Sequence, residues 1–193
     1  MTTTTKPQRV QRLVHQLPPV HLEAEVPTDP RWTLAVDGLV ARQLVLDIDD
    51  LKTLGGREVA LDFHCVWGWS RKAARWTGVT VGRVLDEAGI APDATVVTVA
   101  CVVPPYASCV RLADVREGVI AWGLDGGDIP AENGGPLRFV QPPWLWGYKG
   151  VKWVGRLTAG DRFVPGFWEE KVGNPEGRVP AEVLAPFATG EDA

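Results

Sequence analysis

The stretch His64-Cys65-Val66-Trp67-Gly68-Trp69-Ser70 places one cysteine at the end of an apolar run and follows it with two tryptophans around a glycine. The pattern predicts that a strand ends and a loop begins at this thiol, and functional residues gather at such junctions. A buried cysteine is more often a small hydrophobic residue of the core. The rest of the chain therefore decides between a packing role and a functional role for Cys65.

The composition predicts one globular domain, with or without a tail. The chain has 193 residues, of which 45% are hydrophobic and 23% are charged, enough to bury a sizeable core. The formal net charge of -4 comes from acidic residues spread along the chain, which argues against a nucleic-acid-binding surface and a polybasic membrane patch. We therefore expect a small molecule as the partner.

The amino terminus carries no secretory signal pattern. Residues 1–9 contain no apolar core and no twin-arginine pair. No apolar run in the chain approaches the length that spans a bilayer. We expect no membrane span and a cytoplasmic location.

The chain has three cysteines, Cys65, Cys101 and Cys109. Their number is too small and odd for a disulfide scaffold, and their spacing matches no pair of zinc-binding motifs. They are expected to be free thiols or ligands. Nine tryptophans stand beside two tyrosines, and we expect most of them to pack in the core and some to wall a pocket.

Short strands and two helices are predicted along the chain, with no internal repeat. Strands are expected where apolar residues form short runs or alternate with polar ones, at 32–38, 43–46, 57–64, 94–101, 109–112, 119–124, 137–140 and 151–157. Helices are expected at 47–55 and 80–89, the second with Thr80 as its cap and Gly89 as its stop. This order predicts an α+β domain with mixed sheets over 29–170, preceded by an irregular arm at 1–28 and followed by a tail at 171–193.

Two glycine-containing segments suggest an anion cradle. In Asn133-Gly134-Gly135-Pro136-Leu137-Arg138 a tight turn precedes a strand that carries a guanidinium. In 147–153, Gly150 lets backbone N–H groups approach a phosphate while Lys149 and Lys152 supply charge. The alternative is a solvated basic strand end after a hairpin. Neither segment has the spacing of a nucleotide-binding glycine loop.

Four motifs occur in a fixed order. They are 64–70 with Trp76-Thr77-Gly78-Val79, then 133–138, then 147–153, and then Pro165-Gly166-Phe167-Trp168-Glu169. Together they resemble the molybdopterin-binding domain of the sulfite oxidase family, above all its small bacterial members and the catalytic subunit of the periplasmic methionine sulfoxide reductase. The resemblance covers the chain from about residue 32 to residue 169.

The resemblance implies a β-rich, mixed-sheet fold that binds a molybdenum–molybdopterin cofactor, with Cys65 as the metal's only protein ligand. A thiolate suits this metal because it is soft and rich in electrons. The implied reaction is oxygen-atom transfer on a small sulfur- or nitrogen-oxide substrate, with Tyr106 hydrogen-bonding to bound oxygen or substrate. Positions that contact the cofactor in these relatives are matched here by Cys101, Asn133, Arg138, Gly150, Val151 and Lys152.

The chain also departs from this family's pattern. Pro104-Pro105 stands where relatives often have two glycines before Tyr106, and Arg111 stands where they have a proline. The arm offers His21 in place of the asparagine or arginine that clasps the pterin. Relatives' haem-binding and dimerisation domains have no counterpart in the 25 residues after Trp168, so we expect a separate electron-transfer partner.

Two alternatives to this enzyme stay open at this point. The first is a non-catalytic module that keeps the fold and serves as a subunit or in assembly. The second is an enzyme with Cys65 as nucleophile and His64 or His15 as its base. The second is weaker, because adjacent residues on a strand point to opposite faces.

Overall fold

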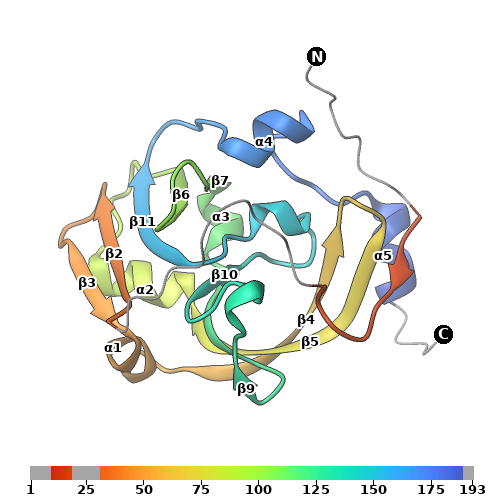
Figure 1. The fold of residues 1–193 in the computed structure, drawn as a ribbon. Helices are drawn as coiled ribbons and strands as arrows, with labels where there is room; N and C mark the ends of the chain where they lie inside the picture. Colours follow the sequence, from red (N-terminus) through yellow and green to blue (C-terminus); the bar gives the residue numbers. More distant parts are fainter. Residues whose placement is uncertain (1–9, 19–30, 189–193) are drawn as a thin grey trace.

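The computed structural model describes residues 10–18 and 31–188, which form two mixed β-sheets with short helices around them (Figure 1). The strands are β1 (Arg12–Leu13), β2 (Thr33–Gly38), β3 (Leu44–Asp47), β4 (Arg57–Cys65), β5 (Trp69–Thr80), β6 (Val96–Cys101), β7 (Ala107–Arg111), β8 (Val119–Leu124), β9 (Gly127–Asp128), β10 (Arg138–Val140) and β11 (Val154–Gly160). The helices are α1 (Ile48–Thr53), α2 (Val81–Ala88), α3 (Leu112–Val115), α4 (Phe167–Val172) and α5 (Ala181–Ala188), with 3-10 turns η1 (Ala131–Asn133) and η2 (Gly147–Lys149).

The strand order and strand directions of the two sheets are those of an α+β fold. The first runs in the order β1-β5-β8-β10, with β4 beside β5 and β9 beside β8. The second runs in the order β3-β2-β11-β6-β7. The pairs β1–β5 and β2–β11 are parallel and the other pairs are antiparallel, which confirms the predicted mixed sheets.

Helix α2 forms where the sequence predicts it. Thr80 caps its amino end by accepting a hydrogen bond from the N–H of Arg83 at 3.3 Å, and Gly89 ends it with a left-handed φ of 70°. Val84 and Leu85 on its inner face are fully buried. Burial of such side chains stabilises the fold by about 1.5–3 kcal/mol each. No helix in the described part of the chain is long and apolar enough to cross a membrane.

Strand β5 is the largest difference from the sequence prediction, which expected a loop after Cys65. The chain makes a turn at Val66–Gly68 and returns as a 12-residue strand, with Cys65 paired to Trp69. Positive φ at Ala73 and a register shift between Leu61 and Phe63 interrupt the alternation that marks a strand in sequence. The thiol therefore lies at the tip of a β-hairpin.

In the described part of the chain, the core consists of three groups of buried side chains, and two of them hold this hairpin. Phe63 and Trp76 pack with Leu17 of the amino-terminal arm in one group. In another, Val66 packs with Trp146 and with Val183 of α5. The hairpin tip is thus fixed from both sides, which limits the positions that Cys65 can take.

Both ends of the chain contribute to the structure near this hairpin. In the arm, β1 pairs in parallel with β5 through Arg12 and Leu13, whereas the sequence prediction had an irregular arm. In the segment predicted as a tail, Phe187 of α5 packs edge-on against His64, with ring centres 4.6 Å apart. Helices α3, α4 and α5 were not predicted, because each is too short or too irregular in pattern to show a helical period. His21 lies outside the described residues.

Candidate active site

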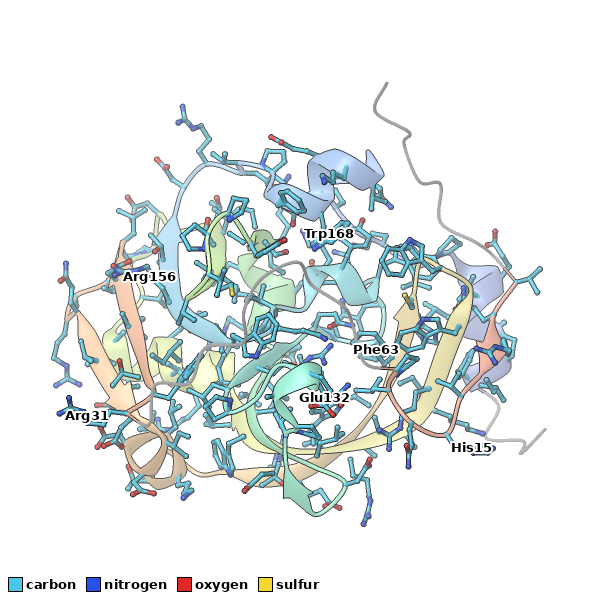
Figure 2. The ribbon with its side chains drawn as sticks, in the orientation of Figure 1. His15, Arg31, Phe63, Glu132, Arg156 and Trp168 are labelled. Atoms are coloured by element: carbon cyan, nitrogen blue, oxygen red, sulfur yellow. The ribbon has the colours of Figure 1, made fainter. Side chains whose placement is uncertain are left out.

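A cavity of about 340 Å³ lies where the β4–β5 hairpin, the segment around η2, α4 and the start of β7 meet. Phe63 of β4 and Trp168 of α4, both labelled in Figure 2, line it. Of the eight site residues predicted from sequence, all except Asn133 line this cavity: Cys65, Cys101, Tyr106, Arg138, Gly150, Val151 and Lys152. The structure thus brings together residues that lie up to 87 positions apart in sequence, from Cys65 to Lys152.

The thiol of Cys65 is the candidate metal ligand. It is partly buried in the cavity wall. Burial raises the pKa of Cys65, and the backbone N–H of Trp67 partly opposes that rise. The thiolate therefore needs a positive partner at this position, and a metal ion supplies one.

Arg138 is a buried cation without a carboxylate partner in the described ranges. Its guanidinium lies 5.2 Å from the ring centre of Phe63 and 5.3 Å from that of Trp76, and Nη1 donates to the carbonyl of Asn133 at 2.7 Å. Among the residues that the structure describes, none accepts a hydrogen bond from its Nε. Burial lowers the pKa of Arg138 to about 10. An unpaired buried charge is costly, so this position fits an anionic ligand.

Lys152 adds a second cation beside Arg138. Its Nζ donates to the carbonyl of Glu132 at 2.5 Å. Burial, and then the nearby charge of Arg138, lower the pKa of Lys152 to about 7, while Glu132 opposes this. The charge of Lys152 is therefore sensitive to pH near neutrality.

We expect the affinity of the ligand-free protein for sulfate to fall as the pH rises above about 7, because Lys152 then loses its proton. One linked proton limits the effect to about tenfold per pH unit. Calorimetric titration with sulfate from pH 6 to pH 9 measures it, since sulfate keeps its charge over this range. Lys152→Arg is the control and should give a flat profile. An equally steep profile in that variant would show that another group titrates.

Beside these cations, two glycines let other side chains of the protein pack directly against the backbone. A Cβ at Gly150 would lie 2.4 Å from Oε1 of Gln141, a buried oxygen that has no partner. A Cβ at Gly134, whose φ is 96°, would lie 2.6 Å from the side chain of Lys152. Any larger residue would displace the groups that form the cradle.

Asn133 lies behind the cavity wall and not in it. Its side-chain Nδ2 donates to the carbonyl of Leu17 at 3.4 Å, and its own carbonyl accepts from Arg138. It therefore links the amino-terminal arm to the buried guanidinium. Asn133 is not among the residues that line the cavity, and its contact with the cofactor stays a prediction.

Lys149 corrects the sequence prediction that it supplies charge to the cradle. Its side chain is 1% exposed and its Nζ is bonded to Glu169. The other donors go to the carbonyls of Cys109 at 2.5 Å and Pro175 at 2.8 Å. These bonds leave Arg138 and Lys152 as the cations of the cradle.

The substrate side of the cavity is aromatic, and sequence reasoning missed most of it. Tyr106 packs edge-on against Phe167 at 4.9 Å, Phe167 against Trp168 at 5.1 Å, and Trp168 against Trp67 at 6.2 Å. Lys171 of α4 also lines the cavity, 4.1 Å from the ring centre of Phe167. The sequence predicted Tyr106 and some pocket-lining tryptophans, but for Phe167 and Lys171 the signal was limited to the motif at 165–169, whose helix has too few residues to show a period.

Cys101 lines the same cavity, near the start of the loop that carries Tyr106. Its Sγ accepts a hydrogen bond from the N–H of Val103 at 3.2 Å, and burial raises the pKa of Cys101. The third cysteine, Cys109, is a buried residue of β7 and does not line the cavity.

Neither histidine proposed as a base lies beside Cys65 in the cavity. His64 is fully buried, its Nδ1 lies 2.8 Å from Oγ of Ser70, and it does not line the cavity. His15 is exposed on the arm (Figure 2). The nucleophilic-cysteine alternative therefore lacks the general base that it requires.

Fold and site together define a class of protein: a β-rich α+β domain whose cavity offers the Cys65 thiol to a metal, and the buried Arg138 with Lys152 beside it to an anionic cofactor. The sequence matches the family model described as oxidoreductase molybdopterin binding domain over residues 21–168, and the chain belongs to this family. Membership identifies the chain as an oxidoreductase of the sulfite oxidase type with a molybdenum–molybdopterin cofactor. The non-catalytic alternative loses support accordingly.

Individual relatives agree with this assignment. The chain is 32% identical over 141 residues to the uncharacterized oxidoreductase YuiH of Bacillus subtilis (strain 168), covering 72% of this chain and 70% of YuiH. It is 30% identical over 156 residues to the protein-methionine-sulfoxide reductase catalytic subunit MsrP of Gluconobacter oxydans (strain 621H), covering 71% of this chain and 49% of MsrP. Among solved structures, the sulfane dehydrogenase SoxCD from Paracoccus pantotrophus matches with a TM-score of 0.62 and 23% identity, covering 68% of this chain and 38% of that chain. That likeness confirms the fold.

The residues around the cavity fit this cofactor. In residues 10–18 and 31–188, no group of three or more His, Cys, Asp or Glu side chains could hold a metal ion. A metal at Cys65 would therefore take its other ligands from the cofactor, as a dithiolene provides. The unpaired Nε of Arg138, with Lys152 beside it, suits the cofactor's phosphate.

Proposed function

We propose that the enzyme transfers an oxygen atom to or from a small sulfur- or nitrogen-oxide substrate, with Cys65 as the protein ligand of molybdenum. One observation carries this proposal: the thiol of Cys65 and the unpaired guanidinium of Arg138 line the same cavity. When bound, the cofactor supplies two-electron oxygen-atom-transfer chemistry.

The chain's own residues have three tasks in this proposal. Cys65 holds the metal at the hairpin tip, and Arg138 and Lys152 hold the anionic part of the cofactor. The phenol of Tyr106 donates a hydrogen bond to the oxygen of the substrate, because it lines the cavity beside the aromatic wall. Trp67 and Trp168 line the mouth, and Phe167 supports Trp168 from behind in this aromatic wall.

The metal and pterin content of the purified enzyme tests the cofactor part of the proposal. Protein made in a host that synthesises the cofactor is expected to contain one molybdenum and one pterin per chain, with an electron paramagnetic signal in the +5 state. If protein purified from that host contains no molybdenum, the cofactor part of the proposal is refuted. The separate electron-transfer partner and the cytoplasmic location stay predictions, and cell fractionation tests the second.

Arg138→Met is expected to weaken cofactor retention while leaving the cofactor-free fold at least as stable. A lost hydrogen bond to a charged group costs roughly 1.5–3 kcal/mol, or about 10- to 150-fold in the dissociation constant. Without ligand, the variant also removes an unpaired buried charge. Pterin content after gel filtration and a thermal melt of the cofactor-free protein measure the two effects. Unchanged pterin content would contradict the assignment of Arg138.

Lys171→Met is expected to change the preference between charged and neutral substrates. Lys171 is exposed at the mouth, so its charge is worth about 0.2–1 kcal/mol, or up to about fivefold in rate. We expect kcat/KM for sulfite to fall by that amount and kcat/KM for dimethyl sulfoxide to stay unchanged. An equal loss with both substrates would show that Lys171 acts through packing on Phe167.

A further inference from the structure

A buried ion pair, Lys149–Glu169, lies next to the active site without being part of it. Both side chains are 1% exposed. Glu169 accepts further hydrogen bonds from Oγ of Ser108 at 2.8 Å and from the N–H of Cys109 at 3.1 Å. Its other oxygen accepts from the N–H of Gly166, which begins α4. Three segments of the chain, η2, β7 and α4, therefore meet at one carboxylate.

In each of these segments, a residue that takes part in this network is the sequence neighbour of a residue that lines the cavity. Tyr148 and Gly150 flank Lys149, and Trp168 precedes Glu169. Ala107 precedes Ser108, whose hydroxyl donates to Glu169. Burial lowers the pKa of Lys149, and the charge of Glu169 opposes this. The network thus ties the cofactor side of the cavity to the substrate side.

Helix α4 depends on this network for its position. It has six residues, and a helix of this length has no stability of its own. Only Glu169 and Val172 of α4 are buried. A buried ion pair adds little net stability compared with apolar side chains of the same size, so its effect is on geometry.

We propose that the buried Lys149–Glu169 pair is a positioning element that fixes Trp168 at the mouth of the cavity and so controls how the substrate is held. The proposal rests on the proposed function only in assuming that a substrate binds at this mouth. Loss of the pair releases α4 from β7 and η2. The indole of Trp168 then loses its place beside Trp67, and the aromatic wall opens.

Fluorine spectroscopy tests the positioning without any activity measurement. The holoenzyme is labelled with 5-fluorotryptophan, and Trp168→Phe and Trp144→Phe assign two of the signals. Glu169→Gln is expected to shift or broaden the signal of Trp168 and to leave that of Trp144 unchanged. Asp114→Asn is the matched control, because Asp114 is also a buried carboxylate but accepts from Nε1 of Trp144 at 2.8 Å and from Arg178, neither of which lines the cavity. It should affect the Trp144 signal only.

Kinetics with dimethyl sulfoxide, at matched molybdenum content, provide the second readout. Glu169→Gln is expected to lower kcat/KM by about 10- to 100-fold, mainly through KM, since misplaced contacts weaken substrate holding. If Glu169→Gln does not fold, Lys149→Met/Glu169→Gln removes both charges and is measured in the same way. An unchanged Trp168 signal in a folded variant, or an unchanged KM, would overturn the proposal. A wild-type enzyme that is inactive on this and other small sulfur- and nitrogen-oxide substrates would refute only the proposed function, because the fluorine signals still decide the positioning.

Discussion

Cys65→Ser is expected to abolish turnover while the pterin stays bound. A serine oxygen is a harder, less polarisable donor than a thiolate sulfur, so the metal loses the soft, electron-rich donor that sets its redox properties. Arg138 and Lys152 remain in place to hold the anionic part of the cofactor. We expect kcat to fall by about three orders of magnitude, which corresponds to about 4 kcal/mol of the activation barrier. The measurements are steady-state rates, pterin content and the electron paramagnetic signal of the +5 state.

Cys109→Ala is the matched control for that variant. Cys109 is 1% exposed and lies outside the cavity, so its loss should cost some stability and leave the rate unchanged. A Cys65→Ser enzyme with wild-type rates and an unchanged spectrum would remove Cys65 from the metal. Loss of pterin together with activity would instead show that the thiol also anchors the cofactor.

Lys149→Met is expected to lower the free energy of unfolding by about 3–5 kcal/mol, because Glu169 is left as an uncompensated buried carboxylate. The loss is a large part of the stability of an ordinary domain. Urea unfolding of the cofactor-free protein at neutral pH measures it.

Two further variants separate charge from packing in that experiment. Lys149→Met/Glu169→Gln removes both charges and is expected to recover most of the loss. Lys52→Met breaks an exposed pair with Asp49, whose side chains are 52% and 87% exposed, and should cost less than about 1 kcal/mol. A small loss in Lys149→Met, similar to that of Lys52→Met, would mean that water reaches Glu169 in the folded protein.

The parts of the site that could be predicted from sequence are those with a local signal. Gly150 between lysines, and Arg138 after a tight turn, predict an anion cradle from short stretches, and the structure places both on one cavity wall. Helix α2 was predicted because its apolar residues share one face between Thr80 and Gly89. In these cases the residues that define the feature are neighbours in sequence.

The other parts depend on contacts between distant residues. Lys149 and Lys152 look alike in sequence, yet the fold buries one against Glu169, 20 positions away, and leaves the other beside the cavity. Strand β5 carries basic residues and a positive φ at Ala73, which hide its period. The aromatic wall needs α4, whose position is fixed by tertiary contacts and not by helix propensity.

The hairpin tip has a consequence for how such a domain can diversify. The proposed metal ligand, Cys65, is fixed by strand pairing, by packing on the group that contains Phe63, and through Val66, which packs with Trp146. The mouth, by contrast, is built from α4 and the loop before β7. Sequence change at the mouth can therefore give new substrate preferences while the redox centre keeps its surroundings. The Lys149–Glu169 pair is where these two halves meet, so change there affects both.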